Sequence, residues 1–443
     1  MYEPVIGMEI HVELGTRSKM FCGCPADHFG KKPNTQTCPV CLAMPGGLPV
    51  PNKKAIEWTI KLGLALGCEI PMFSKFDRKN YFYPDLPKGY QISQYDQPLA
   101  INGKVGTSFD RVRIRRVHLE EDTGKLQHTT VDGKKVSLVD FNRGGVPLME
   151  IVTEPDIHSG EQAKEFLKRL YQIVRYLGIS EADMEKGSMR LEPNISVRPV
   201  GSQELPDYKV EVKNINSFSF VKRAIEYEVE RQSKILESGK TPAQENRGWN
   251  EDKGITVLQR SKENAEDYRY FPEPDIPPLR FREEQISELR TQIPELPDAR
   301  LARFIKGYEL NDYDSTLLTD TRQLADYFEE CVKVAKNVKE KNLTPKKLAN
   351  WIINKKIDIE KVLPAQLVVE IKKTLEIVAV DYAEVNDVIG KVIASNTKAV
   401  SDYQKGKEAS LMFLVGQVMR AVKGRADAAK LKEDIINHIK KYA

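Results

Sequence analysis

The stretch Ile6-Gly7-Met8-Glu9-Ile10-His11-Val12-Glu13-Leu14 alternates apolar residues with polar or small ones near the N-terminus. Because successive residues of a β-strand point to opposite faces, this alternation predicts a strand with one apolar face and one face that carries two carboxylates and an imidazole. Such a polar face offers ligands for a metal ion. The pattern is equally typical of an amphipathic edge strand whose acids face water, so the rest of the chain has to discriminate between the two interpretations.

Length and composition indicate a globular protein of several domains. The chain has 443 residues, of which 40% are hydrophobic and 30% are charged, and this length exceeds what one compact core supports. No apolar run approaches the length of a membrane span, and the N-terminus lacks the pattern of a secretory signal. We therefore expect a cytoplasmic protein.

The charge is unevenly distributed along the chain. The formal net charge is +4, and the segment from residue 402 to the end holds nine Lys or Arg against five Asp or Glu, which accounts for the whole excess. A basic terminal module indicates a polyanionic partner such as RNA, although a solvated helical face would look similar.

Helix and strand patterns are mixed up to about residue 280. Alternating runs predict strands at residues 112–117, 136–141 and 208–212, and helical periodicity predicts helices at residues 54–66, 162–177 and 220–236. Because helices and strands do not strictly alternate, an α+β fold built on a largely antiparallel sheet fits better than a doubly wound fold.

The second part of the chain is predicted to be helical. The proline-rich residues 271–278 indicate an extended connector, and Thr319 and Asp320 are candidate caps of a helix that buries Cys331. A polar break at residues 397–405 precedes two helices, at residues 411–422, ended by Gly424, and at residues 431–439. We therefore expect an α+β domain at residues 1–292, a helical domain at residues 293–398 and a small basic helical domain at residues 399–443.

Four of the six cysteines form two close pairs, Cys22-Gly23-Cys24 and Cys38-Pro39-Val40-Cys41. Disulfides are rare in cytosolic proteins, and four thiolates on two tight turns suit the tetrahedral geometry of a structural zinc site. The insert at residues 22–41 is therefore predicted to bind Zn²⁺ and to have no open position for catalysis, with metal-free thiols as the alternative. Cys68 is predicted to lie on an apolar helical stretch and to be buried.

Residues 75–98 combine aromatic, basic and acidic side chains with three prolines and show no regular period. This composition indicates a functional loop system, with an ordinary surface loop as the alternative. The motifs His118-Leu119-Glu120-Glu121-Asp122 and Gly144-Gly145-Val146-Pro147-Leu148-Met149-Glu150 then place acids beside glycines at predicted strand ends. Because Mg²⁺ prefers oxygen ligands, these acids together with Glu9 and His11 predict a divalent-metal cluster that could serve phosphate chemistry.

These motifs resemble, in order, those of a known family, the B subunit of the tRNA-dependent amidotransferase of the GatCAB type. The similar segments are Gly7-x-Glu9-x-His11-x-Glu13-Leu14, residues 75–98, His118-x-Glu120-Glu121-Asp122, Pro147-Leu148-x-Glu150-Ile151, Lys213-Asn214-x-Asn216-Ser217-Phe218, Asp267-Tyr268-Arg269-Tyr270-Phe271-Pro272 and Leu414-Val415-Gly416-Gln417-Val418-Met419. The resemblance therefore extends from the first strand to the tail.

The resemblance implies a ligase that acts on Glu or Asp misacylated onto tRNA-Gln or tRNA-Asn. In that family the B subunit phosphorylates the side-chain carboxylate with ATP, and ammonia made from glutamine by an amidase A subunit displaces the phosphate. A small C subunit holds the heterotrimer together. The resemblance also implies a first domain similar in fold to glutamine synthetase and a tail that contacts tRNA.

By match to the family pattern, the expected Mg²⁺ ligands are Glu9, His11, Glu120 and Glu150, of which the last two are also expected to act in catalysis. Imidazole is an unusual ligand for Mg²⁺, so Mn²⁺ is a competitor. Since relatives differ in whether they keep the four cysteines, zinc is expected to brace the N-terminal loop rather than to take part in the reaction.

Three further side chains, Lys79, Tyr81 and Lys88, are expected to contact phosphate, ammonia or the aminoacyl group. The chain also departs from the family pattern. Many relatives have Arg-x-Asp-x-Asn where this chain has Arg190-Leu191-Glu192-Pro193-Asn194, and residues 352–389 are expected to form a shorter helical region than usual. The first departure concerns the geometry of the site, and the second concerns the docking of tRNA.

Two other classes of function remain as alternatives. A non-catalytic RNA-binding scaffold would account for the cysteine pairs and the basic tail, and ATP consumption would discriminate against it. An amidase that acts alone on glutamine finds little support, because no Ser-rich or Cys/His nucleophile arrangement stands out.

Overall fold

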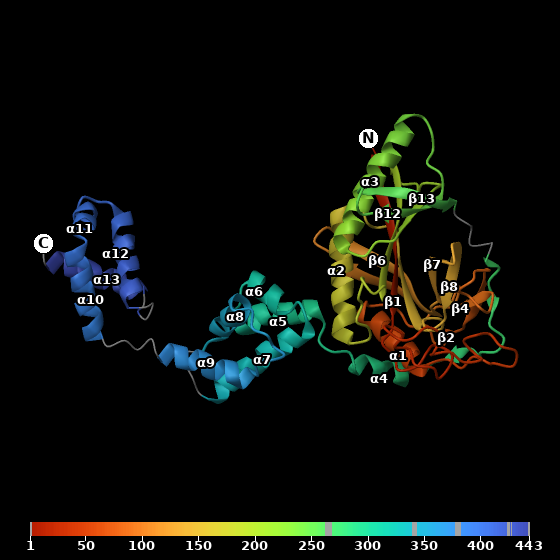
Figure 1. Ribbon diagram of the computed structural model, residues 1–443, viewed down its shortest axis with the longest axis horizontal. Coiled ribbons are helices and arrows are strands. Elements are labelled where there is room, and N and C mark those ends of the chain that lie inside the picture. The colour runs from red at the N-terminus through yellow and green to blue at the C-terminus, as the bar shows by residue number, and fades with distance from the viewer. Residues whose placement is uncertain are drawn as a thin grey trace. The chain divides into compact units, whose positions relative to one another are not determined.

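The computed structural model describes residues 2–261, 268–338, 343–376, 382–422, 426 and 428–441. The chain forms two compact units, Met1–Arg300 and Leu301–Ala443, which run from red to green and from teal to blue in Figure 1. Within the described residues, no helix combines the length and the hydrophobicity that a membrane span requires. Asp267 of the sixth family motif and Gly424 lie outside these residues.

An eight-stranded sheet forms the centre of the first unit (Figure 1). Its strands lie in the order β13-β12-β11-β10-β1-β9-β6-β5, and all neighbours are antiparallel except β11 and β12. The bounds are β1 Tyr2–Glu13, β5 Ala100–Gly106, β6 Arg111–Glu121, β9 Pro147–Thr153, β10 Met189–Pro199, β11 Val210–Lys213, β12 Glu245–Asn250 and β13 Ile255–Ser261. The predicted α+β class with a largely antiparallel sheet is confirmed.

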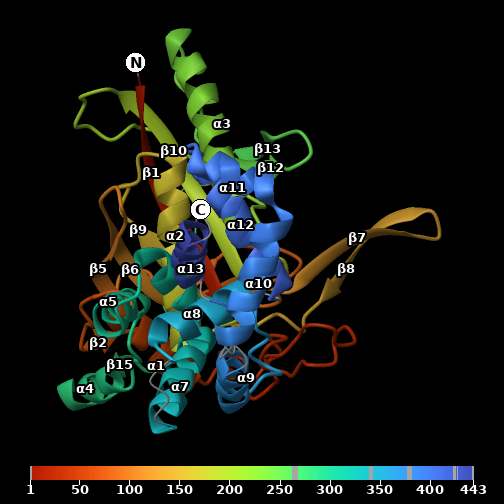
Figure 2. The ribbon, with the colours of Figure 1, turned by 90° about the vertical axis from the view of Figure 1, so that its left-hand side faces the viewer.

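Smaller strand pairings surround this sheet. They are β14-β3-β4, with bounds Phe271–Pro272, Asp77–Asn80 and Tyr90–Ser93; β15-β2, with bounds Leu279–Arg280 and Phe73–Ser74; and the hairpin β7-β8, with bounds Lys125–Val131 and Lys134–Asp140. Figure 2 shows the hairpin extending away from the main sheet. The expectation of a loop system at residues 75–98 is wrong for β3 and β4. β3 pairs with β4 and with the distant β14, and such short strands leave no local period in the sequence.

Four helices lie wholly within the described part of the first unit: α1 Lys53–Ala65, α2 Gly160–Leu177, α3 Phe218–Glu237 and α4 Glu283–Thr291. The first three confirm the helical periodicity. Ser159 and Ser217 begin α2 and α3, because each side chain accepts a hydrogen bond from a backbone N–H in the first turn. Gly178, at φ 65°, ends α2 in the left-handed conformation that glycine adopts without strain.

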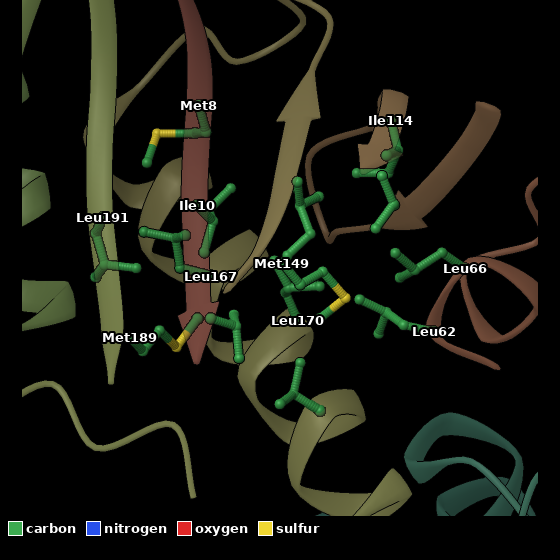
Figure 3. Close-up of a cluster of buried hydrophobic side chains, with 14 of the residues drawn as sticks. Met8, Ile10, Leu62, Leu66, Ile114, Met149, Leu167, Leu170, Met189 and Leu191 are labelled. Carbon is green, nitrogen blue, oxygen red and sulfur yellow. The ribbon is translucent and has the colours of Figure 1, made fainter. Parts of the chain in front are cut away.

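The apolar face of β1 packs against helices. Figure 3 shows Met8 and Ile10 among side chains that include Leu167 and Leu170 of α2, and all four are buried with at most 1% exposure. Each such side chain contributes about 1.5–3 kcal/mol by leaving water. Burial of this face fixes the direction in which the opposite face of β1, with Glu9 and His11, must point.

The second unit is helical. Its first helices are α5 Pro297–Tyr308, which crosses the boundary between the units, α6 Asp312–Leu318, α7 Arg322–Asn337, α8 Pro345–Asn354 and α9 Pro364–Glu376. They enclose a core that contains Phe304, Phe328 and Cys331, so the predicted burial of Cys331 is confirmed. The predicted caps Thr319 and Asp320 are wrong. Thr321 caps α7, since its hydroxyl accepts from Leu324 N, whereas Thr319 ends α6.

The remaining helices are α10 Tyr382–Ser395, α11 Thr397–Gln404, α12 Glu408–Ala421 and α13 Ala428–Lys441. The last two confirm the predicted tail helices. The polar break expected at residues 397–405 is instead the helix α11, whose Ala399, Val400 and Tyr403 pack against the core of α10, α12 and α13. The apolar residues of α11 are few, so they give too weak a period to be recognised in the sequence.

Candidate functional site

A row of polar side chains crosses three neighbouring strands of the main sheet. His11 of β1 lies opposite Glu150 of β9, and Glu150 lies opposite His118 of β6. Glu120 follows His118 by two residues and so lies on the same face of β6. Strand pairing thereby brings together side chains from three distant segments of the chain.

The distances within this row are short. Nε2 of His11 lies 3.3 Å from Oε2 of Glu150 and 3.9 Å from Oε1 of Glu120. Nε2 of His118 lies 3.2 Å from the same Glu150 oxygen and 3.8 Å from Oε2 of Glu120. The hydroxyl of Ser93, on β4, donates a hydrogen bond of 3.0 Å to Glu120. Glu120 and Glu150 are only 3% and 7% exposed, so these partners take the place of water.

Mutual interactions keep these groups charged. Burial favours the neutral form of His11, but Glu150 outweighs it and raises the pKa of His11 to about 9. Burial likewise opposes the ionised form of Glu150, and the two histidines nevertheless hold its pKa well below the usual value. The pKa of Glu120 is lowered against the effect of burial by the hydrogen bond to His118. The centre is thus a set of ionised groups under low solvent exposure.

The donor set of this centre fits a divalent cation. One ligand atom each from His11, Glu120 and Glu150 lies within 4.8 Å of the others, and two carboxylates with one imidazole suit Mg²⁺ or Mn²⁺. Glu9 belongs to a different group. Its carboxylate meets those of Glu192 and Glu211, because two residues along a strand separate it from His11 by about 7 Å. The four predicted ligands therefore fall into two groups on one face of the sheet.

The second group has basic and amide neighbours. Nζ of Lys213, the last residue of β11, lies 2.6 Å from Oε2 of Glu192 and 3.1 Å from Oε1 of Glu211. The side-chain amide of Asn194 donates a hydrogen bond of 3.0 Å to Glu9. The positive charge of Lys213 thus neutralises part of the negative charge of this acidic group.

Lys79 and Tyr81 lie beside the first group, on and next to β3. Burial alone would lower the pKa of Lys79, but Tyr270, Glu120 and Glu150 raise it above its usual value. The Lys79 ammonium lies 4.9 Å from the ring centre of Tyr268. Tyr81 and Tyr270 also meet Tyr268 edge to face, at 6.0 and 6.2 Å between ring centres. The Lys79 ammonium and the phenol groups of Tyr81 and Tyr270 therefore lie near the carboxylates, and Tyr268 contacts all three.

Lys88 is placed differently from Lys79. Its ammonium lies 2.7 Å from Oε1 of Glu121, whose side chain belongs to the opposite face of β6 from Glu120. Lys88 and Glu121 line a cavity of about 260 Å³ together with Cys22 and Cys41. The structure thus puts Lys88 next to the cysteine insert and not in the first carboxylate group.

The four cysteines of the insert converge. The sulfurs of Cys22, Cys24, Cys38 and Cys41 all lie within 4.8 Å of one another, and thiolates at such spacing fit a tetrahedral Zn²⁺ site. The pKa of Cys41 is lowered to about 5, mainly by a hydrogen bond from Cys22. Burial opposes this shift, whereas the backbone N–H of Cys38 and the nearby Lys19 add to it. Cys68 and Cys331 lie outside this cluster and are buried, as predicted. The predicted helical position of Cys68 is wrong, because α1 ends at Ala65.

Sequence reasoning assigned no role to His118, Ser93, Glu211 or Lys213. His118 and Glu120 do show the two-residue spacing of one strand face, and so do Glu211 and Lys213. This spacing shows which side chains share a face within one strand, but it does not show which strands are neighbours. The two-residue spacing can therefore be found in the sequence, whereas the make-up of each carboxylate group depends on the pairing of strands that are distant in the sequence.

Comparison with known proteins gives matches along most of the chain. A family model described as the GatB/GatE catalytic domain matches residues 4–287, and one described as the GatB domain matches residues 359–439. Three similar proteins are each named as the B subunit of an aspartyl/glutamyl-tRNA(Asn/Gln) amidotransferase. The protein of Thermomicrobium roseum is 49% identical over 97% of this chain and 96% of its own length. The protein of Caldanaerobacter subterraneus is 47% identical over 96% of this chain and 97% of its own length. The protein of Caldicellulosiruptor saccharolyticus is 45% identical over 99% of this chain and 99% of its own length.

Proposed function

The chain belongs to the B-subunit family of the aspartyl/glutamyl-tRNA amidotransferases, and on this basis we propose that it activates the side-chain carboxylate of Glu or Asp misacylated on tRNA-Gln or tRNA-Asn. The carboxylate is phosphorylated by ATP, and ammonia then displaces the phosphate to give the amide. A carboxylate is a poor acyl donor, so phosphorylation supplies a leaving group that amide formation needs. The observation that carries this proposal is the convergence of His11, Glu120 and Glu150 on one face of the sheet.

These three residues are the proposed ligands of a Mg²⁺ ion. When bound there, the ion would offset the negative charge that gathers on the phosphoryl oxygens. His118 and Ser93 hold the carboxylates Glu150 and Glu120 in place through the contacts described above. Ligands that are already held in position need less reorganisation during the reaction than ligands that must first be ordered.

Lys79 is the proposed basic partner of the reacting groups. Its ammonium keeps its charge beside Glu120 and Glu150 and can pair with a phosphoryl oxygen. Tyr81 and the neighbouring phenol rings of Tyr268 and Tyr270 limit the access of water. Because water hydrolyses an acyl phosphate, such shielding favours attack by ammonia.

The family relationship also supports proposals on partners and cofactors. The ammonia would come from glutamine through an amidase A subunit, and a small C subunit would complete the heterotrimer. Lys88 borders a cavity on the cysteine side of the sheet, where it is proposed to act in substrate passage. The helical tail is proposed to contact tRNA, and the first domain to share the fold of glutamine synthetase. Because the proposed substrate is a tRNA, a cytoplasmic location is proposed as well.

The cysteine insert is proposed to bind structural Zn²⁺. The mutual spacing of the sulfurs supports this assignment, and Lys19, whose ammonium lies 3.8 Å from the sulfur of Cys41, would balance part of the negative charge of four thiolates. A site with four protein ligands leaves no position for substrate. Its role is therefore to fix the insert next to the cavity that Lys88 lines.

The proposal is tested with the reconstituted heterotrimer, ATP, glutamine and Glu-tRNA-Gln or Asp-tRNA-Asn. We expect Glu120→Ala and Glu150→Ala to lower the rate of amide formation by about a hundredfold or more, since loss of a metal ligand removes several kcal/mol of charge stabilisation. Glu230→Ala, which removes an exposed carboxylate paired with Lys234 on α3, is the matched control. Unimpaired amide formation by both site variants would refute the metal assignment.

A further inference from the structure

Arg116 of β6 carries a positive charge that no acid of the described chain neutralises. Two other arginines of the same strand each bind a carboxylate with two hydrogen bonds: Arg113 binds Asp156 at 2.8 and 2.6 Å, and Arg115 binds Glu154 at 2.9 and 2.7 Å. Arg116 forms no such ion pair within the part of the chain that the structure describes. Its Nε is buried and has no hydrogen-bond partner there. Because a buried donor without an acceptor is costly, this guanidinium requires an anion from outside the chain.

A β-bulge directs Arg116 to the polar face of the main sheet. The register of β6 against β9 shifts between Ile114 and Arg116. Ile114, before the shift, is 1% exposed and lies in the core, whereas Arg116 lies two residues before His118 and shares its face. Without the shift, strand alternation would place Ile114 and Arg116 on the same face. Bulges often redirect a side chain next to a functional site, and this one brings a guanidinium to the face of the candidate centre.

Arg116 is a neighbour of both acidic groups on this face. It lies opposite Val152 of β9, and Val152 lies opposite Glu9 of β1. Two strand spacings, about 10 Å, therefore separate the backbone of Arg116 from that of Glu9. In the next row across the same three strands, His118 lies opposite Glu150, the carboxylate shared by the candidate centre. A ligand bound between the two acidic groups would thus have the guanidinium on its β6 side.

The backbone of Tyr95, just after β4, holds the guanidinium. Nη1 of Arg116 donates a hydrogen bond of 3.5 Å to the backbone oxygen of Tyr95. The N–H of Tyr95 in turn donates a bond of 3.0 Å to Asp77, and its ring stacks on that of Tyr270 with 4.4 Å between the ring centres. Tyr95 is therefore fixed through its backbone and through its ring. Since a guanidinium has five N–H donors, a bond at Nη1 leaves donors for an incoming acceptor.

A phosphate group is the anion that suits this arginine best. The planar guanidinium offers paired N–H donors that match two oxygens of a phosphate, and the proposed reaction brings phosphate to this face. The side-chain carboxylate of the substrate fits less well. It has to attack phosphorus, and pairing with a guanidinium would stabilise its charge and so lower its reactivity.

We infer that Arg116 binds a phosphate group at the candidate site and that the carbonyl of Tyr95 positions it for this task. The inference rests on the proposed function and deepens it. Two sources of phosphate exist in that reaction, the terminal phosphate of ATP and the phosphodiester next to the 3′-terminal nucleotide of the tRNA. In the first case the guanidinium would offset negative charge on the transferred group. In the second case it would fix the end of the tRNA.

The experiment is calorimetry on the zinc-loaded full-length chain with Mg²⁺ and three probes. These are AMP-PNP, a non-hydrolysable analogue of ATP; ADP, which lacks the terminal phosphate; and a short single-stranded RNA that ends in CCA. If Arg116 binds the terminal phosphate of ATP, Arg116→Met should weaken the binding of AMP-PNP by about 10–100-fold and that of ADP much less, since a charged hydrogen-bond partner is lost. If it binds a phosphate of the tRNA, the binding of the RNA should weaken instead.

Two variants control for charge and for position on the strand. Arg116→Lys keeps the charge but loses the paired donors, so its affinity should lie between those of Arg116→Met and the natural protein. Arg113→Met, which removes an ion-paired arginine of the same strand, should bind all three probes as the natural protein does.

The melting temperature separates ligand binding from a structural role. Because Arg116 has no acid partner within the described residues, Arg116→Met should melt no lower than the natural protein. Equal binding of all three probes by Arg116→Met and the natural protein would overturn the inference alone, whether or not the melting temperature falls, and would leave the proposed function standing. A natural protein that binds none of the probes would overturn the proposed function and the inference together.

Discussion

Nε2 of His118 lies 3.2 Å from Oε2 of Glu150, and His118 is only 2% exposed. The same carboxylate oxygen lies 3.3 Å from Nε2 of His11, which is the more exposed of the two imidazoles. One carboxylate is therefore shared between a histidine that can bind an ion and a histidine that can orient the carboxylate. The two histidines have different roles in this account, and variants can separate them.

We expect His118→Gln to weaken Mn²⁺ binding at the first group by about 10–100-fold, because residues that orient metal ligands contribute this much to affinity. Calorimetry on the full-length chain measures the affinity. In the heterotrimer the Mg²⁺ concentration for half-maximal activity should rise, while the rate at saturating Mg²⁺ should change less. His128→Gln, at an exposed histidine of the β7-β8 hairpin, is the control. An unchanged affinity in His118→Gln would show that His118 does not position the ligands.

The affinity for a divalent ion should rise with pH. The pKa of His11 is about 9 in the metal-free protein, so the imidazole carries a proton at neutral pH that an incoming ion must displace. Affinity should therefore increase up to about pH 9 and level off above it, with release of about one proton per ion. Calorimetry in two buffers of different ionisation enthalpy measures this release. Binding that is independent of pH between about 6.5 and 9 would contradict the assignment of His11.

Removal of one thiol should release zinc from the insert. Elemental analysis should find about one zinc per chain in the natural protein and none in Cys41→Ser, since a structural site needs all four ligands. The melting temperature of the variant should fall as well, because structural zinc stabilises the fold that holds it. Cys68→Ser, at a buried cysteine outside the cluster, should retain zinc. Natural protein without zinc would favour the metal-free alternative.

Two glycine variants should change stability in opposite directions. A Cβ on Gly160, the first residue of α2, would lie 2.8 Å from the backbone oxygen of Lys222 on α3. Gly160→Ala should therefore cost about 1–3 kcal/mol of unfolding free energy. Gly416 lies within α12 with no other atom near its would-be Cβ, so Gly416→Ala should stabilise the tail by about 0.5–1 kcal/mol. Urea denaturation measures both effects, and the same sign for both would contradict the packing described here.

Local patterns are sufficient to predict the faces of the central strand. The alternation around Met8 and Ile10 predicts which side chains are buried, because the period of a strand is a property of the strand alone. The burial of Cys331 can be predicted in the same way from the helical period of its own segment. The α+β class follows from finding both periods along the chain without strict alternation. The candidate centre is predicted in part, since His11, Glu120 and Glu150 do meet.

Long-range pairing explains what the sequence does not predict. The sequence places Glu9 and His11 on one face of β1, but it does not show which strands lie on either side of β1. Without those neighbours, the two residues are predicted to belong to one cluster. The register places Glu9 opposite Glu192 and His11 opposite Glu150, on different neighbours of β1. Lys213 likewise forms its ion pair with Glu192 because β10 pairs with β11. The first residue of α7 is a local feature that the sequence also leaves open. Thr319, Asp320 and Thr321 are all residue types that cap helices, and in the structure Thr321 is the cap.

The central claim is that the side-chain carboxylate is phosphorylated before it is amidated, and an isotope experiment tests it most directly. Glu-tRNA-Gln or Asp-tRNA-Asn with ¹⁸O in both side-chain carboxylate oxygens is given to the heterotrimer with ATP and glutamine. If the carboxylate attacks the γ-phosphorus and ammonia later displaces phosphate, mass spectrometry will find one ¹⁸O atom in the inorganic phosphate, and ADP as the other product. Label in AMP, or phosphate free of ¹⁸O while amide accumulates, would contradict the account.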